Sequence, residues 1–272
     1  MTTPGNEFLD RTPQGFGAYL CARSAGARPD AAALTALCER LDLVNEFGGK
    51  PTAGESVAFL RRHGVATGGA IVDDDVLHAD WVIHAASRRD GIVESFCREA
   101  SKVLAPARVR VLSGVIGTKN YTGTAMNNWA YARQVVQQPA AAMPNAFLVP
   151  MSKTAEWWKK GWMERHTYFL PRYDDQGRML SEGHALAAAA GIPCMLRRTY
   201  RHPVEPAPEG TYDFITYFEC ADADVPTFHA VCEALRDVAR NPEWRFVREG
   251  PTWHGRRVAS ARELLAQAEV AR

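Results

Sequence analysis

The segment 178–193, RMLSEGHALAAAAGIP, contains the histidine best suited to bind a planar metal cofactor. It predicts a helix that ends at Gly191, where glycine and the nearby proline stop the helical hydrogen bonds. Ala187 and Ala188 follow His184 at i+3 and i+4 and therefore share its helix face. These small side chains would let a broad planar group approach the imidazole, and one such histidine commonly holds haem iron. The alternative is a solvated histidine on an alanine-rich helix.

Two consecutive arginines, Arg197 and Arg198, follow this helix in a segment that predicts a strand. Side chains alternate between the two faces of a strand, so we expect one arginine to point inward. Replacement of the other arginine by alanine should have little effect on function. An arginine above an apolar pocket needs an anionic partner, because an unpaired buried charge is unfavourable. A small oxyanion or a propionate would supply one; a surface arginine is the alternative.

Tryptophan is concentrated in the stretch 117–204, between the two halves of the predicted fold. Core packing would explain this concentration. Because charged residues lie beside them, however, the tryptophans fit the wall of a large flat pocket better. Four of the seven in the chain lie here: Trp129, Trp157, Trp158 and Trp162.

Two strand–helix–strand patterns flank this stretch and must position it. The first has a predicted strand at 80–87, a helix at 91–104 and a strand that begins RVRVL. The second has a strand at 213–220, a helix at 225–239 and the strand WRFVRE. Apolar residues at helical spacing give the second helix one buried face. The repeat predicts an α+β fold of two ferredoxin-like modules whose sheets could close into a barrel.

Residues 1–65 are predicted to form an N-terminal helical extension that carries no chemistry. Asp30 can cap the helix AAALTALCERLD, and a second helix, ESVAFLRRH, is expected to stop at Gly64. The first ferredoxin-like repeat is then expected over 66–145. The second, with the candidate site, is expected over 146–272.

The composition excludes several classes of function. With 32 basic and 31 acidic residues the formal net charge is +1, so no nucleic-acid partner is indicated. None of the six cysteines forms a CxxC pair, which favours reduced thiols over disulfides or a zinc site. The N-terminal segment lacks the basic and apolar parts of a secretory signal, and no apolar run approaches the roughly 18 residues of a membrane span. We expect a cytoplasmic protein with no membrane partner.

Four segments resemble, in the same order, motifs of the chlorite dismutase superfamily, and together they place the likeness over about 66–255. That resemblance implies haem b as the cofactor, a dimeric α+β barrel fold, and a homo-oligomer, commonly a pentamer in the longer-chain branch. The four segments are GTKNYTG (117–123), PMSKTAEWW (150–158), LRRTY (196–200) and DFITYFE (213–219).

The resemblance also implies a role for individual residues. His184 would be the axial ligand of the iron, with Lys153 hydrogen-bonding nearby and Glu243 as the carboxylate partner. Such a partner makes the imidazole more electron-rich. Arg197, at the family's spacing from His184, would be the mobile distal arginine that pairs with an anionic substrate. The haem propionates would be held by Asn120, Tyr121 and Trp157.

The chain departs from the family pattern between Trp158 and His184. Extra residues, including WMERHTYFLPRYDDQGR, introduce His166 as a rival ligand, which we expect in a loop or at the pocket rim. The loop after Arg197 is also longer than in the family. Both insertions are expected to border the pocket.

Four functions follow from the resemblance. The first is a haem oxidoreductase that converts chlorite to chloride and dioxygen, with Arg197 holding the anion. The second, coproheme decarboxylase, uses a tyrosine where this chain has Val149, which argues against it. The third is a related haem enzyme that acts on peroxide or an organic substrate. The fourth is a haem-binding or sensor protein without catalysis, which an arginine above open iron disfavours.

Overall fold

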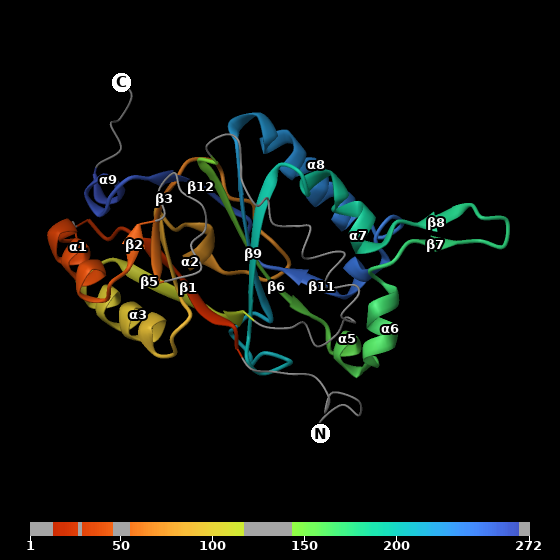
Figure 1. Ribbon diagram of the computed structural model, residues 1–272, viewed down its shortest axis with the longest axis horizontal. Helices are drawn as coiled ribbons and strands as arrows, with labels where there is room; N and C mark the ends of the chain where they lie inside the picture. The colour runs from red at the N-terminus through yellow and green to blue at the C-terminus, as the bar shows by residue number, and fades with distance from the viewer. Residues whose placement is uncertain (1–12, 27–28, 46–54, 117–142, 267–272) are drawn as a thin grey trace.

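The fold is built around a closed β-barrel. The computed structural model describes residues 13–26, 29–45, 55–116 and 143–266. Within these ranges ten strands form one sheet, and eight of them close into a ring because β10 pairs with both β9 and β6 (Figure 1). All neighbours in the ring are antiparallel. In order around the ring, the strands are β10 (Phe214–Cys220), β9 (Met195–Arg201), β5 (Arg108–Ile116), β1 (Gly15–Arg23), β4 (Trp81–Ser87), β3 (Ser56–Arg62), β12 (Trp253–Val258) and β6 (Asn145–Lys153).

Each half of the chain has the β-α-β-β-α-β order of a ferredoxin-like module. The first half runs β1, α1, β3, β4, α3, β5, and the second runs β6, α7, β9, β10, α8, β12. The predicted α+β barrel is therefore confirmed. The helices of the two modules are α1 (Ala31–Arg40), α3 (Ile92–Val103), α7 (Gly183–Ala187) and α8 (Val225–Arg236).

The prediction of a separate helical extension over 1–65 is wrong for the part of it that the structure describes. The helix after Asp30 is present, and the Asp30 carboxylate accepts hydrogen bonds from the amides of Ala32 and Ala33 at 2.8 and 3.2 Å. However, β1 lies between β4 and β5, and the segment predicted as a second helix is the strand β3. Its first five residues are buried, so both faces are apolar and the alternation typical of a half-exposed strand is missing.

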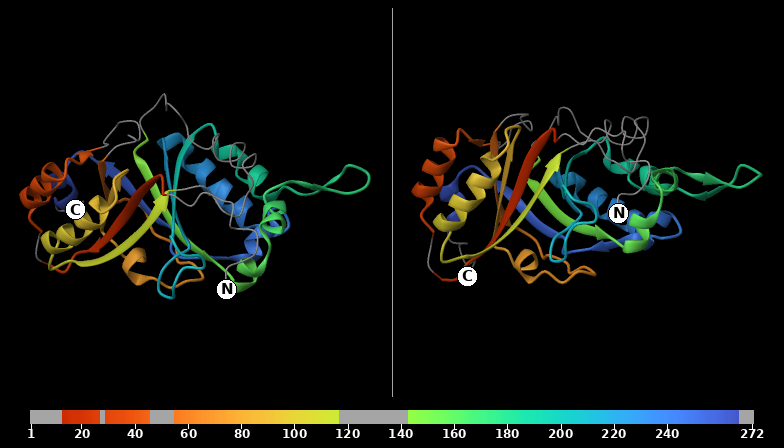
Figure 2. Two further views of the ribbon diagram at one scale, coloured as in Figure 1. Left: turned by 60° about the horizontal axis from the view of Figure 1, so that its bottom comes forward. Right: turned by 90° about the horizontal axis from the view of Figure 1, so that it is seen from below.

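The described residues form four apolar clusters; the smallest, around Trp157, Phe169 and Phe246, lies near His184, and the barrel separates the other three. One fills the barrel and includes Tyr19, Leu148 and Trp253. The second lies between the strands of the first half and the helices α1, α3 and α9 (Ala261–Leu265). The third lies between the strands of the second half and the helices α7 and α8. Figure 2 shows the helices of each half on the outside of its own strands.

Short elements complete the structure. A hairpin projects away from the barrel in all three views of Figures 1 and 2. None of the helices in the described ranges is long and apolar enough to cross a membrane. The short elements are β2 (Val44–Asn45), α2 (Asp74–Leu77), α5 (Ala155–Lys159), α6 (Trp162–Thr167), the hairpin strands β7 (Arg172–Tyr173) and β8 (Met179–Ser181), the 3-10 helices η3 (Ala189–Gly191), η4 (Asp222–Asp224) and η5 (Pro242–Phe246), and β11 (Val247–Glu249).

Candidate functional site

His184 lies in the short helix α7, on the outer face of the second half. The helix predicted over 178–193 is wrong at its start, because β8 occupies residues 179–181 and α7 begins only at Gly183. Gly183 has a φ of +66°, and a Cβ there would lie 2.4 Å from the Leu170 carbonyl oxygen, so this turn requires glycine. The His184 amide donates to the Tyr168 carbonyl at 3.2 Å, which fixes the start of the helix.

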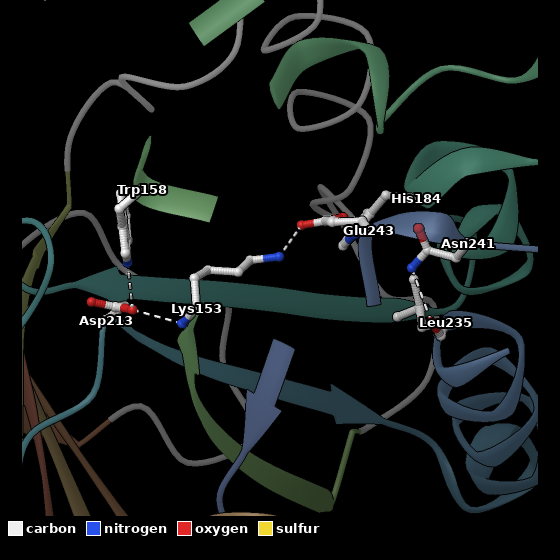
Figure 3. A network of polar contacts seen from close by, with 7 residues as sticks. All are labelled: Lys153, Trp158, His184, Asp213, Leu235, Asn241 and Glu243. Atoms are coloured by element: carbon white, nitrogen blue, oxygen red, sulfur yellow. Dashed lines mark hydrogen bonds and ion pairs between the residues drawn. The ribbon is translucent and has the colours of Figure 1, made fainter. Parts of the chain in front are cut away.

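A hydrogen-bonded relay connects His184 to a buried ion pair (Figure 3). The Nδ1 of His184 donates to Glu243 Oε2 at 2.8 Å, and Glu243 Oε1 accepts from Lys153 Nζ. The side chains of Glu243 and Lys153 are each only 4% exposed. Because Nδ1 is engaged as a donor, Nε2 is the nitrogen that keeps a lone pair for a metal. The structure thus brings together three residues that the sequence had placed in one site.

The protonation states of the relay favour metal binding by the imidazole. Burial lowers the pKa of His184; Glu243 opposes this effect, whereas Arg197 and Lys153 add to it. Burial alone would raise the pKa of the Glu243 carboxyl, but Lys153 and His184 outweigh burial and lower that pKa to about 2. At neutral pH the site therefore holds a neutral imidazole hydrogen-bonded to an ionised carboxylate.

Asp213 holds the end of β6 in place beside this relay (Figure 3). Its Oδ2 accepts from the Lys153 amide at 2.7 Å and from the Trp158 Nε1 at 3.3 Å. The Lys153 ammonium also lies 4.3 Å from the centre of the Trp157 ring. Sequence reasoning missed Asp213 as a positioning residue, although it is the first letter of the DFITYFE motif.

An open pocket lies between the strands of the second half and the helices α7 and α8. His184 and Arg197 both line it, and nearly all of its other lining side chains are apolar. The small residues Ala188 and Gly191 line the pocket together with His184, as the helical spacing predicted for Ala188. The same prediction is wrong for Ala187, which is buried in the core of the second half and does not line the pocket. Its other lining residues are Val149, Met151, Ile192, Met195, Thr216, Phe218, Val231, Cys232, Leu235, Trp244 and Glu249.

The two arginines of β9 lie on opposite faces, as strand alternation predicted. Arg197 lines the pocket, so it is not a simple surface residue. Arg198 faces the barrel interior, where its Nη1 lies 3.3 and 3.2 Å from the two ring nitrogens of His84. His84 is fully buried and shares a hydrogen bond of 2.8 Å with the Tyr200 hydroxyl.

The predicted pocket wall of tryptophans is wrong for the three of them that the structure describes. Trp157 is fully buried, and its ring packs against Lys153 and Phe246. Neither Trp157 nor Trp158 lines the pocket that contains His184 and Arg197, and Trp162 is 36% exposed on α6. Trp244, which the sequence did not single out, lines the pocket instead. Trp129 and the predicted propionate ligands Asn120 and Tyr121 lie outside the described residues.

The rival ligand His166 lies on α6 and does not line the pocket with His184. Its carbonyl accepts from the Phe169 amide at 3.0 Å, so it belongs to the turn that ends α6. Over the described ranges, no group of three or more His, Cys, Asp and Glu side chains could hold a bare metal ion. The pocket is largely apolar, and its charged lining residues besides His184 are Arg197 and Glu249, of which Glu249 is paired with Arg236. A neutral imidazole and a cationic group facing such a pocket instead fit a planar, metal-centred cofactor that carries carboxylates.

Comparison with solved structures finds proteins that share one fold with this chain. No protein-family model matches the chain, and no curated protein matches it. Among solved structures, a mutant chlorite dismutase from Candidatus Nitrospira defluvii is 19% identical with a TM-score of 0.65, over 94% of this chain and 98% of that one.

Two ligand complexes from the same organism agree with this match. A chlorite dismutase in complex with imidazole is 19% identical with a TM-score of 0.64, and a mutant in complex with cyanide is 19% identical with a TM-score of 0.63. Both matches cover 93% of this chain and 94% of the other. Together with the closed barrel and the element order of its two halves, these matches show that the chain has the chlorite dismutase fold.

Proposed function

We propose that this protein is a haem b-dependent oxidoreductase of the chlorite dismutase superfamily, and that it converts chlorite to chloride and dioxygen. One observation carries the proposal: the Lys153–Glu243–His184 relay ends at an apolar pocket that Arg197 also lines. The resemblance of the sequence motifs and the shared fold support it. When bound, the haem would supply an iron centre that accepts and returns an oxygen atom of the substrate.

The relay would set the electron density of the axial ligand. Glu243 keeps the proton of His184 on Nδ1, which leaves Nε2 free to bind the iron. The Lys153 ammonium balances the charge of the carboxylate in an environment that excludes water. An imidazole hydrogen-bonded to an ionised carboxylate is a stronger donor than one bonded to a neutral group, so the relay favours high oxidation states of the iron.

Arg197 would bind the anion. Its guanidinium is always charged and presents a fork of donors that suits a small oxyanion better than a single ammonium does. The apolar side chains that line the pocket with it, such as Val149, Met195 and Phe218, offer few competing polar groups and strengthen this electrostatic contact. Arg197 would therefore attract chlorite and hold the hypochlorite formed from it within the pocket.

Val149 makes coproheme decarboxylase the weaker assignment. This residue lines the pocket at the position where the resemblance places the tyrosine of that chemistry, and its side chain has no group that can donate a proton or an electron. A haem enzyme for peroxide or an organic substrate is the assignment that replaces ours if chlorite is not turned over.

The test combines a spectrum with a gas measurement. Purified protein loaded with haemin should show a Soret band and about one haem per chain, and an oxygen electrode should record dioxygen after chlorite is added. A protein that binds no haemin contradicts the whole proposal. If the haem-loaded protein evolves no dioxygen from chlorite but turns over peroxide, the proposed reaction is wrong and the proposed cofactor is right.

A further inference from the structure

The hairpin formed by β7 and β8, here called the arm (residues 172–181), projects from the body of the protein (Figures 1 and 2). The two strands pair only with each other, in a separate two-stranded sheet. An isolated two-stranded hairpin is at best marginally stable in water. The arm also lies in the stretch that departs from the family pattern, so its role is not given by the resemblance.

Hydrogen bonds within the arm hold its tip in one conformation. The Asp174 Oδ1 accepts from the amides of Gln176 and Arg178, both at 2.9 Å, and Oδ2 accepts from Arg178 Nε at 2.8 Å. Gly177 supplies the positive φ of +75° that the turn needs. These contacts define the shape of the tip, which is what a specific contact surface requires.

Exposed apolar side chains gather on the arm and at its root. Eleven large hydrophobic side chains are exposed in the described part of the chain, and six of them lie between residues 162 and 180. On the arm, Tyr173 is 53% exposed and pairs across the ribbon with Met179, which is 49% exposed, so these two side chains share one face. Leu180 is 60% exposed and, as the next residue of β8, lies on the opposite face. Surface hydrophobic residues scattered singly are normal, whereas a cluster of this kind marks an interaction surface.

A hollow lies at the root of the arm, beside this projecting apolar cluster. It is lined by Tyr168, Leu170, Arg172, Ser181 and Pro242, together with Glu164 and Thr167. The Ser181 hydroxyl is buried there without a hydrogen-bond partner in the described residues. A projection and a hollow next to each other on one patch make that patch complementary to itself, as an interface between two identical chains related by a two-fold axis requires.

The charges of the arm favour a second copy over other occupants. Arg172, Arg178, Asp174 and Asp175 sum to zero, so two arms do not repel each other and the arm has no net attraction for an anionic lipid surface. Arg178 is paired with Asp174 within the arm. Asp175 remains at the tip. The hollow is lined by two charged side chains, Glu164, which is paired with Lys160, and Arg172, so Arg172 can meet the Asp175 of a second copy there.

We propose that the arm is a two-fold contact between two copies of this chain, with the tip of each arm lying in the hollow at the root of the other. The contact would join whatever unit the barrels form, whether a single chain or a ring. It would also lie close to the candidate site, because the arm leads directly into Gly183 and His184.

The test is the mass of the full chain in solution by light scattering. Wild-type protein should have twice the mass of the Tyr173→Ser/Met179→Ser variant at the same concentration. Val65→Ser/Val72→Ser, which changes two exposed side chains outside the arm, is the matched control and should keep the wild-type mass. Circular dichroism should show that all three proteins are folded.

Charge reversal tests the contact without removing apolar side chains. Asp175→Arg alone and Arg172→Asp alone should each weaken the contact by at least about tenfold in dissociation constant, and the two changes in one chain should restore it. Equal masses of the wild-type and the Tyr173/Met179 variant, or no restoration by the double reversal, would overturn the proposal. A wild-type protein that does not self-associate but co-sediments with phosphatidylcholine vesicles would also overturn the proposal. The arm would then be a contact for a lipid surface.

Discussion

Glu243 lies between Lys153 and His184, with one carboxylate oxygen bonded to each. The carboxylate therefore has two tasks at once: it compensates a buried cation and it fixes the tautomer of the imidazole. A residue that serves both the stability of the fold and the electronic state of a ligand can be tested through both properties.

Glu243→Gln should separate these two tasks. The amide removes the ion-pair partner of the buried Lys153 ammonium, which should lower the free energy of unfolding of the cofactor-free protein by about 3–5 kcal/mol. Adding Lys153→Met should recover much of this loss, because the uncompensated charge is then absent. Urea unfolding of the four proteins of the cycle measures the coupling. In haem-loaded protein the weaker donor should also raise the reduction potential of the iron. Equal stabilities of wild-type and Glu243→Gln would contradict the ion pair.

Arg197→Ala should keep the haem content of the wild-type protein and lose most of its turnover of chlorite. Removal of one preorganised donor typically costs about 10²–10³ in rate, and an arginine that moves can cost less. Arg197→Lys should recover only part of the rate, because a point charge does not reproduce the guanidinium fork. Oxygen-electrode rates, normalised to bound haem, measure both variants.

Arg198→Ala is the neighbouring control, and the structure changes what we expect from it. The sequence predicted that this change would have little effect. Because Arg198 contacts the buried His84 inside the barrel, we now expect its loss to lower the free energy of unfolding. Its rate per bound haem should remain that of the wild type. If Arg197→Ala has the same rate as the wild type with chlorite and with peroxide, Arg197 does not act on the substrate.

The two candidate ligands can be distinguished by their alanine variants. His184→Ala should lose haem or shift its Soret band strongly, because the relay then ends in no ligand. His166→Ala should keep both the haem content and the spectrum, since His166 lies on α6 away from the pocket lining. Haem titration followed by visible spectroscopy measures the difference, and the reverse outcome would place the ligand in the insertion.

His254 predicts a pH dependence of stability outside the candidate site. Burial and the neighbouring His63, His229 and Arg256 lower the pKa of His254 to about 4. Between about pH 6.5 and 4 the unfolded chain therefore binds a proton that the folded chain does not, so His254 destabilises the fold as the pH falls through this window. His254→Phe, which can keep the stacking on Phe147 at 4.2 Å, should flatten that decline. Parallel stability curves for the two proteins would contradict the shift.

Some of the fold and much of the candidate site could be predicted from the sequence. The strand and helix patterns around 80–104 and 213–236 are strongly periodic or continuously apolar, and both appear in the structure. His184, Glu243 and Lys153 come together as the resemblance implied, and the alternation of Arg197 and Arg198 needed only the period of a strand.

The errors have identifiable physical causes. The strand β3 is buried on both faces, so its apolar run could not be distinguished from a helix by periodicity. The strand predicted at WRFVRE is limited to β11, because Pro242 starts a 3-10 helix that places Glu243 beside His184. The pairing of β1 between β4 and β5 is a long-range property that no local pattern records.

The two junctions between the halves of the barrel have a consequence for the synthesis of the chain. The first half joins the second where β3 pairs with β12 and where β5 meets β9. The N-terminal module therefore leaves the ribosome with two largely unpaired strand edges. β2 pairs only with the start of β3, so the rest of that edge stays open until β12 has been made. Open edges are templates for aggregation. Nascent chains halted before residue 253 should accordingly be the species that chaperones bind and that accumulate in inclusion bodies.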